Sequence, residues 1–190
     1  MDPRMKQALR EGDSGLARSL IAEDGVGVNT PDENGSTPIY IASEMGHNDC
    51  IRVLHDLGGN IDQAANNGRT PCYAAAWGGH ADTIRLLSGL GANPNTPNDG
   101  GWSPIHIASW KGHNDCIRVL HKQGGNIDQA ANIGDTPCHA AAVGGHADTI
   151  RLLGELGANL NTPDEDGDTP IHIASASGHN DCIRVLHDLG

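Results

Sequence analysis

Apolar positions recur along the chain in two alternating patterns, and each pattern predicts a short helix. In the segment from Asp49 to Leu57, apolar residues follow the i, i+3, i+4, i+7 spacing of one helical face, at Cys50, Val53, Leu54 and Leu57. The segment from Pro71 to Trp77 is rich in alanine, whose small side chain lets neighbouring helices approach closely. No apolar run is long enough to cross a membrane. The pattern therefore predicts an all-α chain of short helices.

The starts of these helices recur at a fixed interval of 33 residues. A serine or threonine directly before proline is typical of a helix N-terminus, because the hydroxyl caps free N–H groups and proline fits the first turn. Such pairs begin at Thr37, Thr70, Ser103, Thr136 and Thr169. Gly-His pairs keep the same interval, and Asn-Gly turns predict hairpin loops. Each unit is therefore helix, turn, helix and loop, and it must stack on its neighbours to bury its apolar faces.

A 33-residue step with Thr-Pro-x-His, Gly-His and Gly-Ala-Asn elements resembles the ankyrin repeat family over nearly the whole chain. The resemblance implies an all-α ankyrin-repeat solenoid of helix-turn-helix units joined by β-hairpin-like loops. We expect a degenerate N-terminal capping repeat, four complete repeats and a partial C-terminal repeat. Their ranges are 1–36, 37–69, 70–102, 103–135, 136–168 and 169–190. Alternate repeats resemble each other more than their neighbours, so the higher period is 66 residues.

The C-terminal end of the chain lacks the polar outer face of a capping repeat. Residues 181–190 repeat the internal sequence and stop where the second helix is expected to end. A capped array should present a polar face there. We therefore expect either a fragment of a longer array or an end that a partner covers. The protein is expected to be monomeric unless the last repeat stacks on another chain.

Charge and cysteine content narrow the classes of partner and compartment. The formal net charge is −12, whereas nucleic acids and anionic membranes require a basic face, so both are excluded as expected partners. A protein partner with a basic or apolar surface is easier to accommodate. The five cysteines fall at apolar helical positions and form no CxxC pair. We expect them to be buried free thiols in a reducing compartment, the cytoplasm or the nucleus.

Histidines, cysteines and carboxylates often bind metal ions or take part in catalysis, but in this chain they have structural explanations. The resemblance assigns His106, His139 and His172, at the fourth position of Thr-Pro-x-His, to a hydrogen-bond network that holds helix and loop. The spacing of His47 and Cys50 suits one metal ion or a Cys–His nucleophile, but a zinc site needs three or four ligands. The acidic run 164–168 fits a calcium loop only partly. We expect no catalytic residue, no metal and no cofactor, which leaves an enzyme as the weakest alternative.

The positions at which the repeats disagree remain as candidates for binding. The resemblance implies that a partner binds the concave face, which is formed by hairpin tips and first helices. All three tryptophans map to this face, and exposed tryptophan is a typical binding anchor. The candidate protein-binding residues are Glu44, Met45, Arg69, Trp77, Trp102, Trp110, Lys111, Ile133 and Asp135. We expect a non-catalytic scaffold for protein–protein interaction. Two alternatives stay open: tryptophans that only pack locally, and a spacer rod of a longer array.

Overall fold

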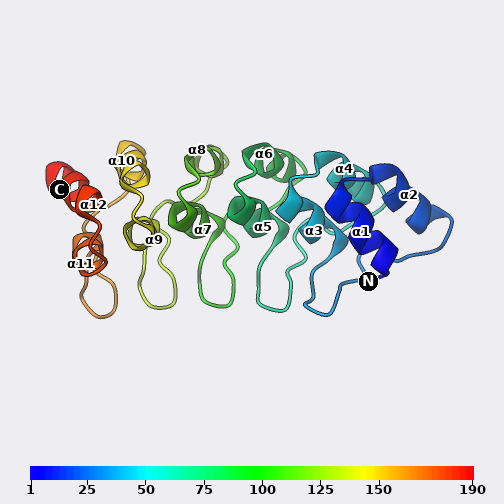
Figure 1. Cartoon of the computed structure of the whole chain (residues 1–190), viewed down its shortest axis with the longest axis horizontal. Coiled ribbons are helices and arrows are strands. Elements are labelled where there is room, and N and C mark those ends of the chain that lie inside the picture. Colours follow the sequence, from blue (N-terminus) through cyan, green and yellow to red (C-terminus); the bar gives the residue numbers. More distant parts are fainter.

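The computed structural model describes residues 1–190 as twelve α-helices without a strand. The helices form two rows with a row of loops below them, and the termini lie at opposite ends of the stack (Figure 1). The first helices of the pairs are α1 (Pro3–Glu11), α3 (Pro38–Met45), α5 (Pro71–Gly78), α7 (Pro104–Lys111), α9 (Pro137–Gly144) and α11 (Pro170–Ala176). The second helices are α2 (Ser14–Ala22), α4 (Asn48–Asp56), α6 (Ala81–Gly89), α8 (Asn114–Lys122), α10 (Ala147–Glu155) and α12 (Asn180–Leu189). The predicted all-α solenoid is confirmed, whereas the exact repeat boundaries stay a prediction.

Side-chain caps mark the starts of α2 and of first helices such as α5, whereas α4, α6, α8, α10 and α12 begin without one. The Thr70 hydroxyl accepts a hydrogen bond from the backbone N–H of Tyr73 at 3.2 Å, and Pro71 occupies the first turn of α5. The sequence predicts a helix near Leu16 to Ala22, but Asp13 caps α2 through the N–H of Leu16, so this helix begins at Ser14, two residues earlier. The remaining predicted bounds agree with the structure to within one residue.

The core is a continuous layer of small and medium-sized side chains between the two rows of helices. Ala74, Ala75 and Ala76 of α5 are each at most 1% exposed, which lets the first helices of adjacent pairs pack closely. In α4 the predicted apolar stripe is only partly correct. Cys50 and Leu54 are buried, Val53 and Leu57 are half-buried, and the stripe omitted the fully buried Ile51. The α4 helix is buried over a wider face because it packs on both neighbouring second helices.

The Gly-His pairs connect one helix pair to the next. His80 and His146 hydrogen-bond through Nε2 to the carbonyls of Glu44 and Trp110, both at 3.0 Å. Each ring lies directly against the glycine that ends the preceding first helix. At Gly112, which has φ +71°, an added Cβ would lie 2.8 Å from Nδ1 of His146. The glycine is needed both for its left-handed backbone and for this close contact.

The loop tips are also connected from one unit to the next. The backbone N–H of Asn66 donates to the carbonyl of Asn34, and that of Asp99 donates to the carbonyl of Asn67. The predicted hairpin loops therefore occur as tight turns that form single backbone hydrogen bonds to their neighbours, and not as strands. These contacts hold the tips in a row beside the first helices.

Candidate protein-binding face

The three tryptophans gather where α5 and α7 meet the tip that connects their units. The ring centroids of Trp77 and Trp110 are 5.8 Å apart and the ring planes are tilted by 42°. Trp102 meets Trp110 edge-on at 6.5 Å and stacks on the buried His106 at 6.5 Å. Aromatic pairs favour such offset and edge-to-face arrangements. The structure thus brings together three predicted residues from two first helices and one tip.

The surrounding frame fixes the position of this cluster. The imidazole of His106 is fully buried, and its Nε2 donates to the carbonyl of Asp135 on the following tip at 2.8 Å. Ser103 caps α7, and its hydroxyl lies 3.0 Å from Nδ1 of the same imidazole. The Thr-Pro-x-His network expected from the resemblance is present at His106. Because that network holds both the tip and the helix start, Trp102 and Trp110 project from rigid elements.

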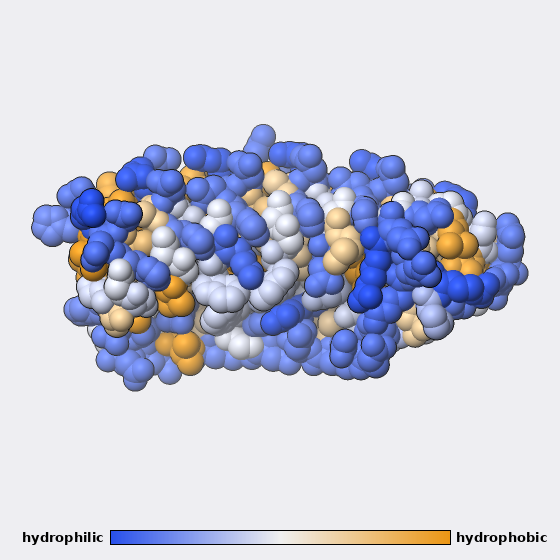
Figure 2. Space-filling model, in the orientation of Figure 1, coloured by the Kyte–Doolittle hydropathy of each residue, from blue (hydrophilic) through white to orange (hydrophobic).

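The cluster borders a shallow hollow of about 350 Å³. The hollow is lined by Arg69, Tyr73, Trp77, Asn98, Gly100, Trp102 and Trp110. The three tryptophans are half-buried and also pack against the core, so local packing accounts for part of their surface. In the space-filling view the middle of the molecule, over α5 and α7, is pale, whereas the orange apolar surface lies towards the two ends (Figure 2). The pale colour marks residues of intermediate hydropathy, such as tryptophan, whose apolar ring carries a polar N–H.

Two cations cover the aromatic rings. The ammonium nitrogen of Lys111 lies 4.1 Å from the ring centroid of Trp77 and 4.5 Å from that of Trp110. The guanidinium carbon of Arg69 lies 5.3 Å from the ring centroid of Tyr73 and 5.4 Å from that of Trp77. All four distances fall within the range of cation–π attraction.

The other four predicted residues lie outside this hollow. Glu44 lines a neighbouring cavity of about 230 Å³ that also includes Arg69. Met45 is 38% exposed at the end of α3, and Ile133 is 56% exposed on the tip before α9. Asp135 is half-buried, and burial raises the pKa of its carboxyl group. These residues flank the tryptophans without joining them.

Sequence reasoning missed three residues of the hollow, Tyr73, Asn98 and Gly100. Tyr73 replaces the histidine at the fourth position of a Thr-Pro-x-His element, where the resemblance implies a structural role. Asn98 and Gly100 come from the tip of the next unit, where Asn98 accepts hydrogen bonds from the N–H groups of Gly100 and Trp102. The Gly100-Gly101 pair, which the other tips lack, is the signal that could have identified this tip.

Comparison with known proteins gives the same architecture. The family model described as ankyrin repeats (3 copies) matches residues 5–98, 66–131 and 105–190. Together the three matches cover nearly the whole chain. The chain belongs to the ankyrin repeat family. The ankyrin repeat domain of human ASB11 superposes with a TM-score of 0.88 at 29% identity, over 100% of this chain and 84% of that one.

Curated relatives match only part of this ankyrin repeat protein. Cortactin-binding protein 2 of Ornithorhynchus anatinus is 36% identical over 59 residues, which are 31% of this chain and 4% of that protein. Its counterpart from Mus musculus is 33% identical over 60 residues, 32% of this chain and again 4% of the relative. The matched segment thus spans about a twenty-fifth of these relatives. No helix of this chain combines the length and the apolar character that a membrane span requires.

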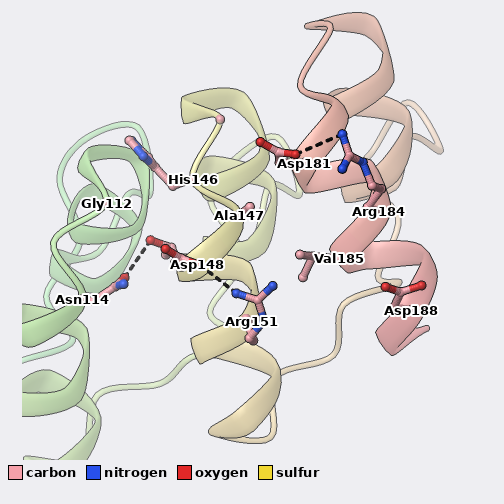
Figure 3. A pocket seen from close by; sticks show the side chains of 12 residues that line it. Gly112, Asn114, His146, Ala147, Asp148, Arg151, Asp181, Arg184, Val185 and Asp188 are labelled. Atoms are coloured by element: carbon pink, nitrogen blue, oxygen red, sulfur yellow. Dashed lines mark hydrogen bonds and ion pairs between the residues drawn. The ribbon is translucent and has the colours of Figure 1, made fainter.

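The largest cavity of this ankyrin repeat protein lies elsewhere and is polar. It measures about 660 Å³ between α8, α10 and α12 (Figure 3). Arg151 pairs with Asp148 at 2.7 Å, and Arg184 pairs with Asp181 at 3.2 Å, all with exposed side chains. An equivalent cavity of about 590 Å³ lies between α4, α6 and α8. The cavity is therefore a repeated groove between outer helices, without the apolar lining typical of a ligand pocket.

One cluster has the composition of a metal site, but its histidine has no free ring nitrogen. Potential ligand atoms of Asp135, His139 and Asp164 lie within 4.8 Å of one another. Nε2 of His139 hydrogen-bonds to the carbonyl of Asp168 at 3.0 Å, and Nδ1 accepts from the N–H of Thr136 at 3.0 Å. Both ring nitrogens are therefore engaged in the structural network, which leaves two carboxylates, fewer than the three or four ligands of a zinc site.

The five cysteines are buried free thiols, as predicted. Burial raises the pKa of Cys50 to about 11. It raises the pKa to about 12 for Cys72, Cys116 and Cys138. Because the thiolate is the reactive form, these side chains act as small apolar core residues.

Proposed function

We propose that this ankyrin repeat protein is a non-catalytic scaffold that binds a partner protein on the concave face formed by its tips and first helices. The centre of the proposed site is Trp77, Trp102 and Trp110 with Arg69 and Lys111. Glu44, Met45, Ile133 and Asp135 form its flanks. The cytoplasm, or the nucleus, is the proposed compartment, because all five thiols are free and buried.

The observation that carries this proposal is the cluster of three half-buried tryptophans around one hollow in the middle of the array. Protein–protein interfaces are enriched in tryptophan, tyrosine and arginine, and the residues that dominate the binding energy cluster near the centre. The hollow between α5 and α7 combines these residue types in the middle of the array. Rigid positioning by the His106 network reduces the entropy lost on binding.

The relatives support an interaction role in general terms. Cortactin-binding protein 2 is named for binding another protein, but the match covers only 4% of it. A short shared segment of a common fold does not transfer a partner. We therefore propose a protein partner without assigning cortactin to this chain.

The test is affinity capture with matched variants. Wild-type protein and the double variant Trp77→Ala/Trp110→Ala are immobilised, and the captured proteins are quantified by mass spectrometry. The control is Arg85→Ala/Arg151→Ala, which removes two exposed arginines of the outer helices. We expect the tryptophan variant alone to lose the partner. Equal capture by all three folded proteins would refute the proposed face.

A spacer within a longer array is the second candidate. The observation in its favour is the near-identity of alternate units, with Asn-Asp-Cys-Ile-Arg-Val-Leu-His in α4, α8 and, again, α12. In a spacer the repeated units would set length, and no single face would dominate binding. Many more such blocks in a longer parent chain, together with unchanged capture by the tryptophan variant, would favour this candidate.

A further inference from the structure

The hollow among the tryptophans has a cationic rim. Arg69 lines it directly, and Lys111 lies over the two rings that form one of its walls. No carboxylate is among the lining residues. Neither Arg69 nor Lys111 has a carboxylate oxygen within 4 Å of its charged nitrogens. The two cations at this place therefore form no contact ion pair within the protein.

This lack of pairing contrasts with the composition of the chain. Aspartate and glutamate number 24, against 12 lysines and arginines, so carboxylates are plentiful. Nε of Arg69 is buried without a hydrogen-bond partner. A buried polar group without a partner is costly. An incoming carboxylate would pair with the guanidinium group as a whole through a charge-assisted hydrogen bond.

The same two cations argue against a cationic ligand. Aromatic rings attract cations, and three tryptophans could form a cage for a lysine or arginine of a partner. Here Lys111 already lies over Trp77 and Trp110, while Arg69 lies over Trp77 and Tyr73. A third cation would have to displace one of them or meet like charge. Among the three tryptophans, only Trp102 has no cation over its ring.

The repeat register makes this combination unique within the chain. The counterparts of Arg69 at 33-residue steps are Ser36, Trp102, Asp135 and Asp168. The counterparts of Trp77 are Glu44, Trp110, Val143 and Ala176. A cation before the first helix therefore meets an aromatic ring at the end of that helix in one unit only, which limits the site to the hollow between α5 and α7.

We propose that the hollow binds a segment of a partner protein in which a large apolar side chain is directly flanked by aspartate or glutamate. The apolar side chain enters the 350 Å³ hollow against Trp102 and Trp110, and the flanking carboxylates pair with Arg69 and Lys111. The inference rests on the proposed function and specifies the chemistry of its partner. Because the net charge of −12 repels a uniformly acidic segment, the carboxylates must lie directly beside the apolar residue.

The indole N–H groups allow a direct test. The chain has three tryptophans, all at the site, so a ¹H–¹⁵N correlation spectrum of the labelled full chain reports on the hollow through three indole signals. Three peptides are titrated to about 5 mM, a range that suits weak single-anchor binding. They are Gly-Ser-Asp-Phe-Glu-Gly-Ser, its neutral analogue with Asn and Gln, and its basic analogue with Lys and Arg.

Matched variants test whether the positive charges of Arg69 and Lys111 contribute to peptide binding. Arg69→Gln and Lys111→Gln each remove one rim cation, and Arg85→Gln removes one exposed outer cation as a control of equal charge change. We expect the acidic peptide to bind about five- to tenfold more weakly to either rim variant, with the control within about twofold of wild type. The amide signals in the same spectra verify that each variant is folded.

The outcomes separate the two proposals. The inference is supported if the acidic peptide binds more tightly than the neutral one and if Arg69→Gln and Lys111→Gln weaken its binding as expected. Equal or tighter binding of the neutral or basic peptide overturns it, as does the absence of shifts with all three. If the tryptophan variant still loses its partner in affinity capture, the binding face stands and only its assigned chemistry is wrong.

Discussion

Replacing His106 with tyrosine should make the stability of the protein less dependent on pH. The buried imidazole donates from Nε2 to the carbonyl of Asp135 at 2.8 Å, so Nδ1 is the unprotonated nitrogen. Nδ1 faces the backbone N–H and the hydroxyl of Ser103. Desolvation lowers the pKa of this histidine to about 4, and the neighbouring His139 acts in the same direction. Protonation therefore opposes the folded state.

The magnitude follows from the two pKa values. An unfolded histidine takes up its proton near pH 6.5, whereas His106 in the folded chain does so only near pH 4. The unfolded state binds more protons between these values, so stability is complete above about pH 7 and falls as the pH decreases to about 4. The difference corresponds to about 3 kcal/mol of unfolding free energy, of which most is lost by about pH 4.5.

The chain itself supplies the matched substitution. Tyr40 and Tyr73 occupy the equivalent position in two other units, and a tyrosine does not titrate in this range. Urea unfolding of wild type and His106→Tyr is followed by circular dichroism at about pH 7.5 and pH 4.5. We expect the loss of unfolding free energy between the two pH values to be about 2–3 kcal/mol larger for wild type. Equal losses in both proteins would refute the reasoning, because carboxylate titration is common to both.

Three further predictions concern the glycines, the buried thiols and the possible metal cluster. Gly112→Ala should lower the unfolding free energy by about 1–3 kcal/mol in urea titrations, because φ is +71° and the added Cβ would lie 2.8 Å from a ring nitrogen of His146. Gly89→Ala, in open space on α6, should raise it by about 0.5–1 kcal/mol, and a similar loss in both variants would contradict this explanation. Ellman's reagent at about pH 8 should label the cysteine thiols only as the chain unfolds, because burial raises the pKa values of Cys72, Cys116 and Cys138. A thiol that reacts rapidly in the folded protein would contradict this prediction. EDTA should leave the melting temperature unchanged, since His139 has no free ring nitrogen to bind a metal ion. Stoichiometric zinc in the purified protein would contradict this prediction.

Local signals in the sequence predicted most of the fold. The Thr-Pro pairs located the starts of the first helices because capping and proline geometry involve only neighbouring residues. The start of α2 was predicted two residues late, since its cap is Asp13 instead of a residue before proline. The apolar stripe of α4 omitted Ile51, which is buried by contact with other units. Single-helix periodicity does not register such contacts.

The sequence likewise predicted only part of the candidate site. Repeat alignment brought all three tryptophans to one face, because a 33-residue step fixes which positions become neighbours in the stack. It did not identify Tyr73, Asn98 and Gly100, which complete the hollow. Alignment gives the backbone position of a residue, whereas the lining of a cavity depends on the directions of its side chains.

By itself, then, the sequence determined the repeat, its caps, its buried thiols and the neighbourhood of its tryptophans. Each of these follows from short-range rules applied once every 33 residues. Only the tertiary structure decided that Lys111 and Arg69 lie over the aromatic rings, without carboxylate partners. The physical reason is that cation–π contacts and ion pairs depend on which long side chains meet across adjacent units, and a linear pattern leaves this choice open.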